Sequence, residues 1–377
     1  MSENYDIAVI GAGIAGASVA ANLAKTGKQV LLLEMESQPG YHTTGRSAAI
    51  FSPVYGPEPI RALTRASRDF FNTPPHGFSD SPLLRPRSAC FLAREDQLSD
   101  LSDLQTELGG GGAISAIDQD VLQTRIPLLR KGYAAAALWD DGTAEIDVAA
   151  LHQGYLCQFK ANGGAVHTNG EVQKITKTSN GWTLAFAQGA FSAKCVVNAS
   201  GAWADVLGEM AGAERIGLIP KRRTALIIDA PDGYDISNLP LTVDVHEEFY
   251  LKPEAGKLLI SPANEDREVP CDVQPDEMDI AICVDRIERA FDISVRRIER
   301  SWAGLRSFVA DKSPVAGFSQ QVEGFYWLAG QGGYGIQSAP ALAEYAAAEI
   351  LGQDIPEHIL GEGFDPAWLK PDRASLQ

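Results

Sequence analysis

Three glycines near the N-terminus are spaced as in a turn that holds a phosphate group. Gly11, Gly13 and Gly16 follow an apolar stretch at 7–10 and precede a helix-forming run at 17–25. In such a turn the first glycine permits a tight bend, the second lets the backbone approach a pyrophosphate, and the third lets the helix pack closely on the strand. The N-terminus of the helix then directs free N–H groups at the phosphates.

An acidic residue completes this unit. A second apolar stretch at 30–33 ends at Glu34, whose carboxylate can accept a hydrogen bond from a ribose hydroxyl. The order of strand, turn, helix, strand and acid predicts a dinucleotide-binding βαβ unit, with Ile14 and Ala15 at the start of its helix. A glycine-rich turn in an ordinary α/β protein is the alternative, but it leaves Glu34 unexplained.

The polar segment that follows should pass the middle of the same ligand. Thr43, Thr44, Gly45, Arg46 and Ser47 are small or polar and come soon after the predicted second strand. We expect Thr43 or Thr44 to cap a helix that begins near Gly45 and turns backbone N–H groups towards an anion. A solvated loop is the alternative.

Later segments repeat the pattern of an apolar strand that runs into small residues. The stretch at 195–198 leads to Gly201, and the strand expected at 325–329 leads to a second glycine turn before a helix at 339–351. Such backbone can lie against a flat cofactor, and the helix start offers further N–H groups. The further residues that we expect to contact the cofactor are Val172, Gly201, Gly330, Gly332, Gly333, Tyr334, Gly335 and Ile336.

The chain length and the order of predicted elements indicate two domains. A chain of 377 residues exceeds the usual size of a single core. We predict an α/β protein in which residues 1–50, 141–219 and 309–377 form a Rossmann-like, discontinuous cofactor domain. Residues 51–140 and 220–308 should form an α+β substrate domain with a mixed or antiparallel sheet.

Charge and composition restrict the class of partner and the compartment. The formal net charge of −17 would repel nucleic acid and anionic lipid surfaces, so neither is an expected partner. The first residues lack the basic and apolar regions of a signal peptide, and no apolar run is long enough to span a bilayer. We therefore expect a cytoplasmic protein that is not integral to the membrane. The five cysteines show no zinc-ligand spacing, and we predict no metal site.

The chain as a whole resembles the flavoprotein family that includes D-amino-acid oxidase, glycine oxidase and sarcosine oxidase. Several long segments are most similar to bacterial D-arginine dehydrogenases: 40–49, 151–155, 220–223, 249–253, 302–311 and 331–337. The resemblance implies non-covalently bound FAD. It also implies oxidation of a D-amino acid, by hydride transfer from Cα to flavin N5, to an imino acid that hydrolyses to a 2-oxo acid and ammonia.

The resemblance assigns a clamp for the substrate carboxylate to Tyr55, Arg223, Arg306 and the backbone of Gly333. This assignment is chemically reasonable, because arginine offers a planar fork that can bind both oxygens of a carboxylate and a tyrosine hydroxyl can add a donor. Arg222 is the adjacent alternative to Arg223, and a surface ion pair is the alternative role for either arginine. An electron acceptor, a quinone or oxygen, must then reoxidise the flavin.

The positions that match the substrate pocket are Ile50, Ser52, Ala89, Val243, Tyr250 and Ile336. Ala89 and Ile50 depart from the pattern, since D-arginine dehydrogenases carry a glutamate that receives the guanidinium and a histidine at these two positions. Both changes remove polarity, so we predict an apolar pocket and a preference for uncharged D-amino acids such as D-Leu, D-Met or D-Phe. A charge could still come from another side, because Asp244, His246, Glu247 and Glu248 lie close to Tyr250 in sequence.

Other activities fit the same architecture. The substrate could be an N-substituted amino acid, an opine or a 2-hydroxy acid, and the chain could serve as the FAD subunit of a larger dehydrogenase complex. Release of ammonia would distinguish a primary amine from the N-substituted substrates.

Overall fold

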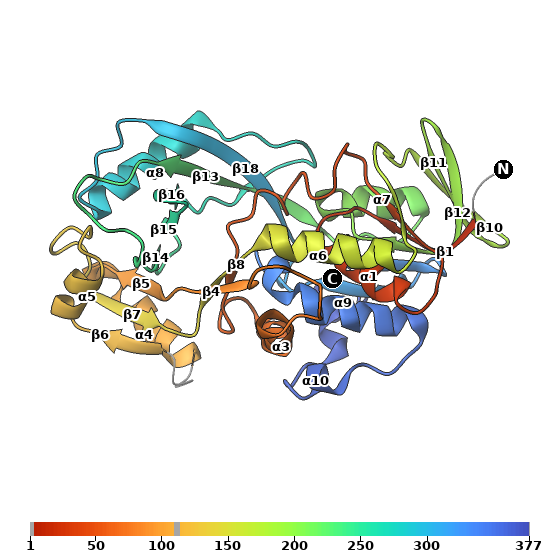
Figure 1. The fold of residues 1–377 in the computed structure, drawn as a ribbon, viewed down its shortest axis with the longest axis horizontal. Coiled ribbons are helices and arrows are strands. Elements are labelled where there is room, and N and C mark those ends of the chain that lie inside the picture. The colour runs from red at the N-terminus through yellow and green to blue at the C-terminus, as the bar shows by residue number, and fades with distance from the viewer. Residues whose placement is uncertain (1–3, 109–113, 377) are drawn as a thin grey trace.

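The computed structural model describes residues 4–108 and 114–376 and contains two large sheets, which lie at opposite ends of the long axis (Figure 1). Long strands of one sheet reach towards the other near the middle of the molecule. Within the described residues, no helix is long and apolar enough to cross a membrane.

The first sheet has eight strands and a parallel centre. Strands β12, β1, β2 and β9 are neighbours in parallel pairs, and β20 joins β12 in the same direction. The members are β1 (Asn4–Ile10), β2 (Val30–Leu33), β9 (Ala165–His167), β10 (Lys174–Thr178), β11 (Gly181–Phe186), β12 (Gly189–Asn198), β19 (Val315–Phe318) and β20 (Phe325–Ala329). All eight fall within the ranges predicted for the cofactor domain. Parallel strands are buried on both faces, which is why β2 and β20 read as unbroken apolar runs.

Helices cover both faces of this sheet. On one face α1 (Ile14–Ala24) packs against α6 (Val148–Ala161) and α9 (Gly335–Leu351). On the other face α7 (Ala204–Ala211) lies against β12 and β20. The helices α2 (Glu58–Ala66) and α3 (Arg68–Asn72) also join this core through Leu63 and Phe71. The sequence placed these two helices with the substrate domain. They pack on the cofactor side because the apolar stripe of α2 faces α9.

The second sheet has nine strands, in the order β17-β13-β16-β15-β14-β5-β7-β6 with β18 paired to β13. It is mixed as predicted: β14 and β5 run parallel and the other pairs are antiparallel. The members are β5 (Ala89–Ala93), β6 (Ile114–Ile117), β7 (Ala136–Asp140), β13 (Ile219–Ile228), β14 (Leu241–Asp244), β15 (Tyr250–Glu254), β16 (Lys257–Ser261), β17 (Asp266–Arg267) and β18 (Ile298–Phe308).

The two faces of the second sheet have different roles. The helix α8 (Glu277–Ala290) covers one face through Cys283 and Ile287, which pack on Leu226 and Ile260. Side chains alternate along a strand, so the neighbours of these core residues point the other way, towards the first sheet. That second face carries the residues of the candidate site.

Smaller elements connect the two sheets. A three-stranded sheet of β3 (Ile50–Phe51), β8 (Ala144–Ile146) and β4 (Leu84–Pro86) lies between them in Figure 1. The remaining α-helices of the described chain are α4 (Leu98–Glu107), α5 (Gln119–Arg125) and α10 (Glu357–Leu360).

Candidate active site

A long cavity joins the carboxyl ends of the parallel strands to the inner face of the second sheet. Residues that follow β1, β2, β12 and β20 line one part of it. Residues of β13, β15 and β18 line the other part. Ligands of open α/β sheets bind at the carboxyl ends of the strands, and this cavity has that position.

Most residues predicted to contact the cofactor line this cavity: Gly11, Gly13, Ile14, Ala15, Glu34, Thr43, Thr44, Arg46, Ser47, Val172, Gly201, Gly330, Gly332, Gly333, Gly335 and Ile336. Gly16, Gly45 and Tyr334 lie outside the lining. Tyr334 instead packs its ring against Tyr55 and Phe308, with centroid distances of 4.9 and 6.1 Å.

Close backbone contacts explain two glycines of the first turn. Gly11 has a φ of +99°, and a Cβ at this residue would lie 2.5 Å from the carbonyl oxygen of Ala199. A Cβ on Gly16 would lie 1.8 Å from the carbonyl oxygen of Gly11. Gly16 therefore lets the start of α1 pack closely against the turn, and Gly16 itself does not line the cavity.

Glu34 is fixed by the backbone at the end of β2. Its Oε2 accepts a hydrogen bond from the N–H of Ala12 (2.9 Å), and its Oε1 accepts one from the N–H of Glu36 (3.0 Å). A carboxylate can accept about four hydrogen bonds, so this group can still accept ribose hydroxyls from the cavity.

The segment around Gly45 forms turns, and the predicted helix there is absent. Thr44 caps a different helix: its Oγ1 accepts a hydrogen bond from the N–H of Ile14 (2.9 Å) at the start of α1. Thr43 donates its hydroxyl to the carbonyl of Leu305 (2.7 Å) in β18. The helix prediction was wrong because both threonines bond to distant segments instead of capping their own.

Arg223 and Arg306 project into the cavity from neighbouring strands. In the β13–β18 ladder Arg223 lies opposite Gly304, and Arg306 lies opposite Lys221. The two arginines therefore share one face, with the glycine leaving space beside Arg223. Arg223 is 7% exposed and donates Nε to the carbonyl of Asn264 (2.9 Å).

The adjacent Arg222 points to the opposite face. Its Nε donates to Oδ2 of Asp279 (2.8 Å) on α8, and its guanidinium also pairs with Glu268. Alternation along β13 thus separates a structural arginine from one that lines the cavity. This placement favours Arg223 over Arg222 for the clamp.

Tyr55 and Gly333 lie beside Arg306. The Arg306 side chain lies close enough to Tyr55 to influence the pKa of its hydroxyl, and a Cβ on Gly333 would lie 2.8 Å from Nη1 of Arg306. Burial, and next the nearby carboxylate of Glu247, raise the pKa of Tyr55. The hydroxyl therefore stays protonated at neutral pH and can donate a hydrogen bond. Tyr55 itself lies just outside the cavity lining.

The two guanidinium groups influence each other. Burial, and next the positive charge of Arg306, lower the pKa of Arg223. Burial also acts against the charge of Arg306, but Tyr55, Tyr250 and Glu247 outweigh it and raise the pKa of Arg306. In the part of the chain that the structure describes, no carboxylate forms an ion pair with Arg306, whereas Arg223 lies 3.4 Å from Glu265 and 3.9 Å from Glu247.

The residues predicted to form the substrate pocket are only partly brought together. Tyr250 and Ile336 line the cavity, and Val243 pairs directly with Tyr250 across β14 and β15. Ala89 lies one strand further, opposite Leu241, and is buried outside the lining.

Ile50 and Ser52 come from a separate element, also outside the cavity lining. Ile50 lies in β3 opposite Glu145, and the N–H of Ser52 donates to Oε1 of Gln337 (3.0 Å) on α9.

A buried acid lies next to Ala89. Asp140 is opposite Ala89 in the β5–β7 ladder and is 1% exposed. Its Oδ1 accepts a hydrogen bond from the N–H of Gly142 (2.7 Å), while its Oδ2 has no partner among the described residues. Burial raises the pKa of Asp140, which favours its neutral form.

Comparison with known proteins identifies the family. A family model described as FAD dependent oxidoreductase (DAO) matches residues 6–349. The chain belongs to this DAO family. Among curated relatives, human mitochondrial dimethylglycine dehydrogenase is 25% identical over 98% of this chain, which spans 44% of that protein. Glycine oxidase from Geobacillus kaustophilus is 24% identical and covers 90% of this chain and 91% of its own.

Solved structures of DAO-like flavoproteins have the same fold. Glycine oxidase from Geobacillus kaustophilus superposes with a TM-score of 0.81 at 22% identity, covering 94% of this chain and 96% of its own. The dithionite-reduced L-α-glycerophosphate oxidase from Mycoplasma pneumoniae, which has FAD bound, gives a TM-score of 0.83 at 18% identity, covering 97% and 98%. These likenesses agree with the predicted α/β fold.

Two unpartnered polar atoms in this DAO-family chain fit a bound FAD. Oγ of Ser307 and Nε2 of Gln331 are buried and have no hydrogen-bond partner in the described chain, and both residues line the cavity. A buried polar group without a partner costs about 1–3 kcal/mol, so a polar ligand would satisfy both. Together with the glycine turn and Glu34, they can hold a nucleotide cofactor.

Several cavity residues were not predicted from the sequence. They include Met35, His42, Trp203, Trp302, Ser307 and Gln331. Strand alternation could have found Trp302, which lies on the same face as Gly304 and Arg306. Ser307 lies within β18 beside Arg306, and the other residues lie outside the strands, where no alternating pattern indicates which way a side chain points.

Proposed function

We propose that the protein oxidises D-amino acids with uncharged side chains to imino acids, which hydrolyse to 2-oxo acids and ammonia. The observation that carries this proposal is the pair Arg223 and Arg306, which face the same cavity as the nucleotide-binding turn. FAD, held non-covalently, supplies the acceptor for the hydride that leaves Cα. Binding and orientation are the work of the protein.

The arginines meet the substrate carboxylate. Moving a carboxylate from water into a closed site costs several kcal/mol unless cations and donors receive it. Arg306 has no protein carboxylate as an ion-pair partner among the described residues, so its charge is available to the substrate. The Tyr55 hydroxyl and the Gly333 backbone add donors, and the fixed carboxylate then orients Cα.

Hydride release sets a condition on the substrate amine. Release of a hydride from Cα needs the lone pair of the neutral amine, so the substrate ammonium must first lose its proton. Glu247 and Glu265 lie near Arg223 and balance part of the positive charge of the clamp.

The polar groups near Ala89 and Ile50 do not suit a guanidinium side chain. Glu145 is already paired with Arg87 (2.9 Å) and Lys252 (3.0 Å). Asp140 is buried, its Oδ1 accepts a hydrogen bond from the N–H of Gly142, and it lies outside the cavity lining. Near Ala89 and Ile50, a buried guanidinium would have no free ionised partner, which costs several kcal/mol, so we expect D-Arg and D-Lys to be poor substrates.

A second candidate is an N-substituted amino acid. The curated relatives include a dimethylglycine dehydrogenase, and a structure titled iminodiacetate oxidase superposes with a TM-score of 0.78 at 18% identity. Such substrates also bring a carboxylate to the clamp. The D configuration and the absence of an N-substituent rest on the resemblance to D-arginine dehydrogenases.

Product analysis tests the proposal. The purified protein should reduce an artificial dye with D-Leu or D-Met and release ammonia and the matching 2-oxo acid in equal amounts. Dye reduction that exceeds the rate with air alone would support a quinone-type acceptor over oxygen. Release of an amine or an amino acid from N-substituted substrates, with no ammonia from any D-amino acid, would overturn the proposal.

A further inference from the structure

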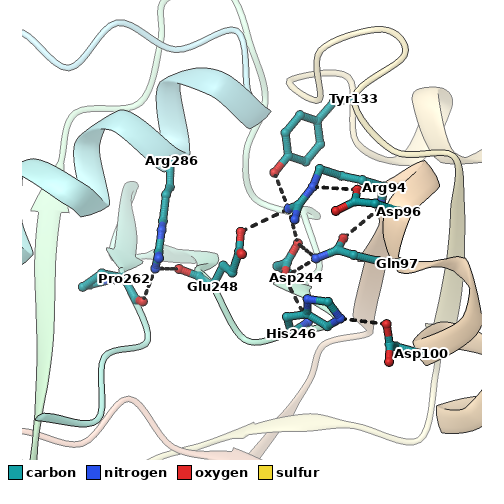
Figure 2. A network of polar contacts seen from close by, with 10 residues as sticks. All are labelled: Arg94, Asp96, Gln97, Asp100, Tyr133, Asp244, His246, Glu248, Pro262 and Arg286. Atoms are coloured by element: carbon teal, nitrogen blue, oxygen red, sulfur yellow. Dashed lines mark hydrogen bonds and ion pairs between the residues drawn. The ribbon is translucent and has the colours of Figure 1, made fainter.

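The hairpin between β14 and β15 is held by a polar network around the buried Asp244 (Figure 2). Asp244 is fully buried and accepts hydrogen bonds from Nη1 of Arg94 (3.0 Å), Nε2 of Gln97 (3.1 Å) and the N–H of His246 (2.9 Å). These bonds join the start of the hairpin to the segment that precedes α4. Several hydrogen bonds to one buried carboxylate favour a single conformation of the hairpin.

The part of the hairpin next to β15 is also fixed by polar contacts. Glu248 pairs with Nη1 of Arg94 (3.1 Å), and Arg286 of α8 donates to the carbonyls of Glu248 and Pro262. His246 bonds to Asp100 (2.8 Å) on α4. Asp244, His246 and Glu248 are thus all committed to structural contacts, as Figure 2 shows.

Glu247 is the acid of this hairpin that takes no part in the network. Its backbone φ is +54°, which is unusual for a residue other than glycine. Its carboxylate lies 3.9 Å from Nη2 of Arg223, with a side chain 45% exposed. Its charge acts to raise the pKa of both Tyr55 and Tyr334.

The other acid near the clamp is already paired. Glu265 accepts a hydrogen bond from Lys221 (2.7 Å) as well as from Arg223 (3.4 Å). Among the described residues, the Glu247 carboxylate lies near Arg223 and pairs with no second cation. Of the two acids near the clamp, Glu247 is therefore the one whose negative charge is less neutralised. The hairpin holds this charge 3.9 Å from Nη2 of Arg223, a member of the proposed clamp.

We propose that Glu247 is a charge filter that restricts the substrate to compounds with one carboxylate. A second anionic group next to the clamp would approach the Glu247 carboxylate, and the repulsion between like charges disfavours binding. A monocarboxylate avoids this repulsion. The inference rests on the proposed clamp, and it predicts discrimination against dicarboxylates and phosphate esters.

Ligand binding to the oxidised holoenzyme tests the filter without turnover. Butyrate and succinate have the same chain length, and their dissociation constants can be measured from changes in the visible flavin spectrum. Glu247→Gln should strengthen succinate binding relative to butyrate by roughly tenfold or more, since one charge is removed. Glu247→Asp should keep most of the wild-type preference, and Glu277→Gln, on an exposed turn of α8, should keep all of it.

The outcomes separate the two proposals. An unchanged succinate-to-butyrate ratio in a Glu247→Gln holoenzyme with normal melting temperature would overturn the filter alone. Failure of the wild-type holoenzyme to bind either carboxylate would overturn the clamp, and the filter with it. If Glu247→Gln loses its fold, a wild-type ratio in Glu247→Lys would overturn the filter equally.

Discussion

Arg223 and Arg306 lie on one face of the β13–β18 ladder, two residue pairs apart along it, because Arg223 is opposite Gly304 and Arg306 is opposite Lys221. This register brings two cations from distant parts of the chain to one end of a cavity that also contains the nucleotide-binding turn. The account of function depends on this relationship.

Substituting either arginine tests the clamp. Arg306→Lys should raise the KM for the amino acid roughly 10- to 100-fold, because a hydrogen bond to a charged group is worth about 1.5–3 kcal/mol and lysine cannot bind both oxygens. Arg223→Lys should act in the same direction. Steady-state kinetics on the FAD-loaded enzyme would measure both effects.

Arg222→Lys is the matched control. This residue lies on the same strand but faces Asp279 and Glu268. We expect a lower melting temperature and an unchanged KM. A KM that rises as much in Arg222→Lys as in Arg223→Lys would contradict the assignment.

Tyr55→Phe removes a donor from the clamp. We expect kcat/KM to fall by about tenfold, since an ordinary hydrogen bond contributes about 0.5–1.5 kcal/mol. Tyr334→Phe is the control, because its ring packs on Tyr55 outside the cavity lining. Equal losses in the two variants would indicate a packing role for Tyr55.

Gly16→Ala tests the first turn. The added methyl group would lie 1.8 Å from the carbonyl oxygen of Gly11, so the turn must deform and FAD binding should be lost. Gly189→Ala adds a methyl group that meets only Phe186, at 3.8 Å, and should bind FAD normally. Flavin content after purification measures the difference, and a fully yellow Gly16→Ala protein would contradict the assigned geometry.

His152 links stability to pH. Its Nε2 lies 2.9 Å from the carbonyl oxygen of Ala12, and burial lowers the pKa of His152 below its usual 6.5. The folded state therefore resists a proton that the unfolded chain accepts, and the stability from this group is lost as the pH falls below about 6.5. The free energy of unfolding of His152→Gln should decline less steeply with acidification.

His246→Gln serves as the control for this pH dependence. The hydrogen bond to Asp100 raises the pKa of His246. The small contribution of His246 to the free energy of unfolding therefore has the opposite sign, and it is lost as the pH rises above the raised pKa. A steeper acid decline in His152→Gln than in wild type would contradict the structural role of His152.

The parts of the fold that depend on local sequence could be predicted. The spacing of Gly11, Gly13 and Gly16 and the position of Glu34 after an apolar strand identify the first unit, because each feature acts within one βαβ segment. The short apolar strands and the turn residues between them likewise predict the parallel first sheet and the mixed second sheet.

Features that depend on long-range pairing could not be predicted. Thr44 caps α1 from a distant turn, and Arg222 and Arg223 can be told apart only when the register of β13 is known. Asp140 gains its relation to Ala89 from a strand pair. The charge near Tyr250 was anticipated in general, but only the hairpin geometry separates Glu247 from Asp244 and Glu248.

Anaerobic reduction of the bound flavin tests the central claim most directly. The FAD-loaded enzyme would be mixed, without oxygen, with D- and L-forms of Leu, Met, Phe and Arg, and with N-methylated and 2-hydroxy analogues. The account predicts rapid bleaching by the D-forms of Leu, Met or Phe and slow or absent bleaching by the L-forms and by D-Arg. Bleaching by D-Arg far faster than by every apolar D-amino acid, or by N-methylated or 2-hydroxy analogues alone, would contradict it.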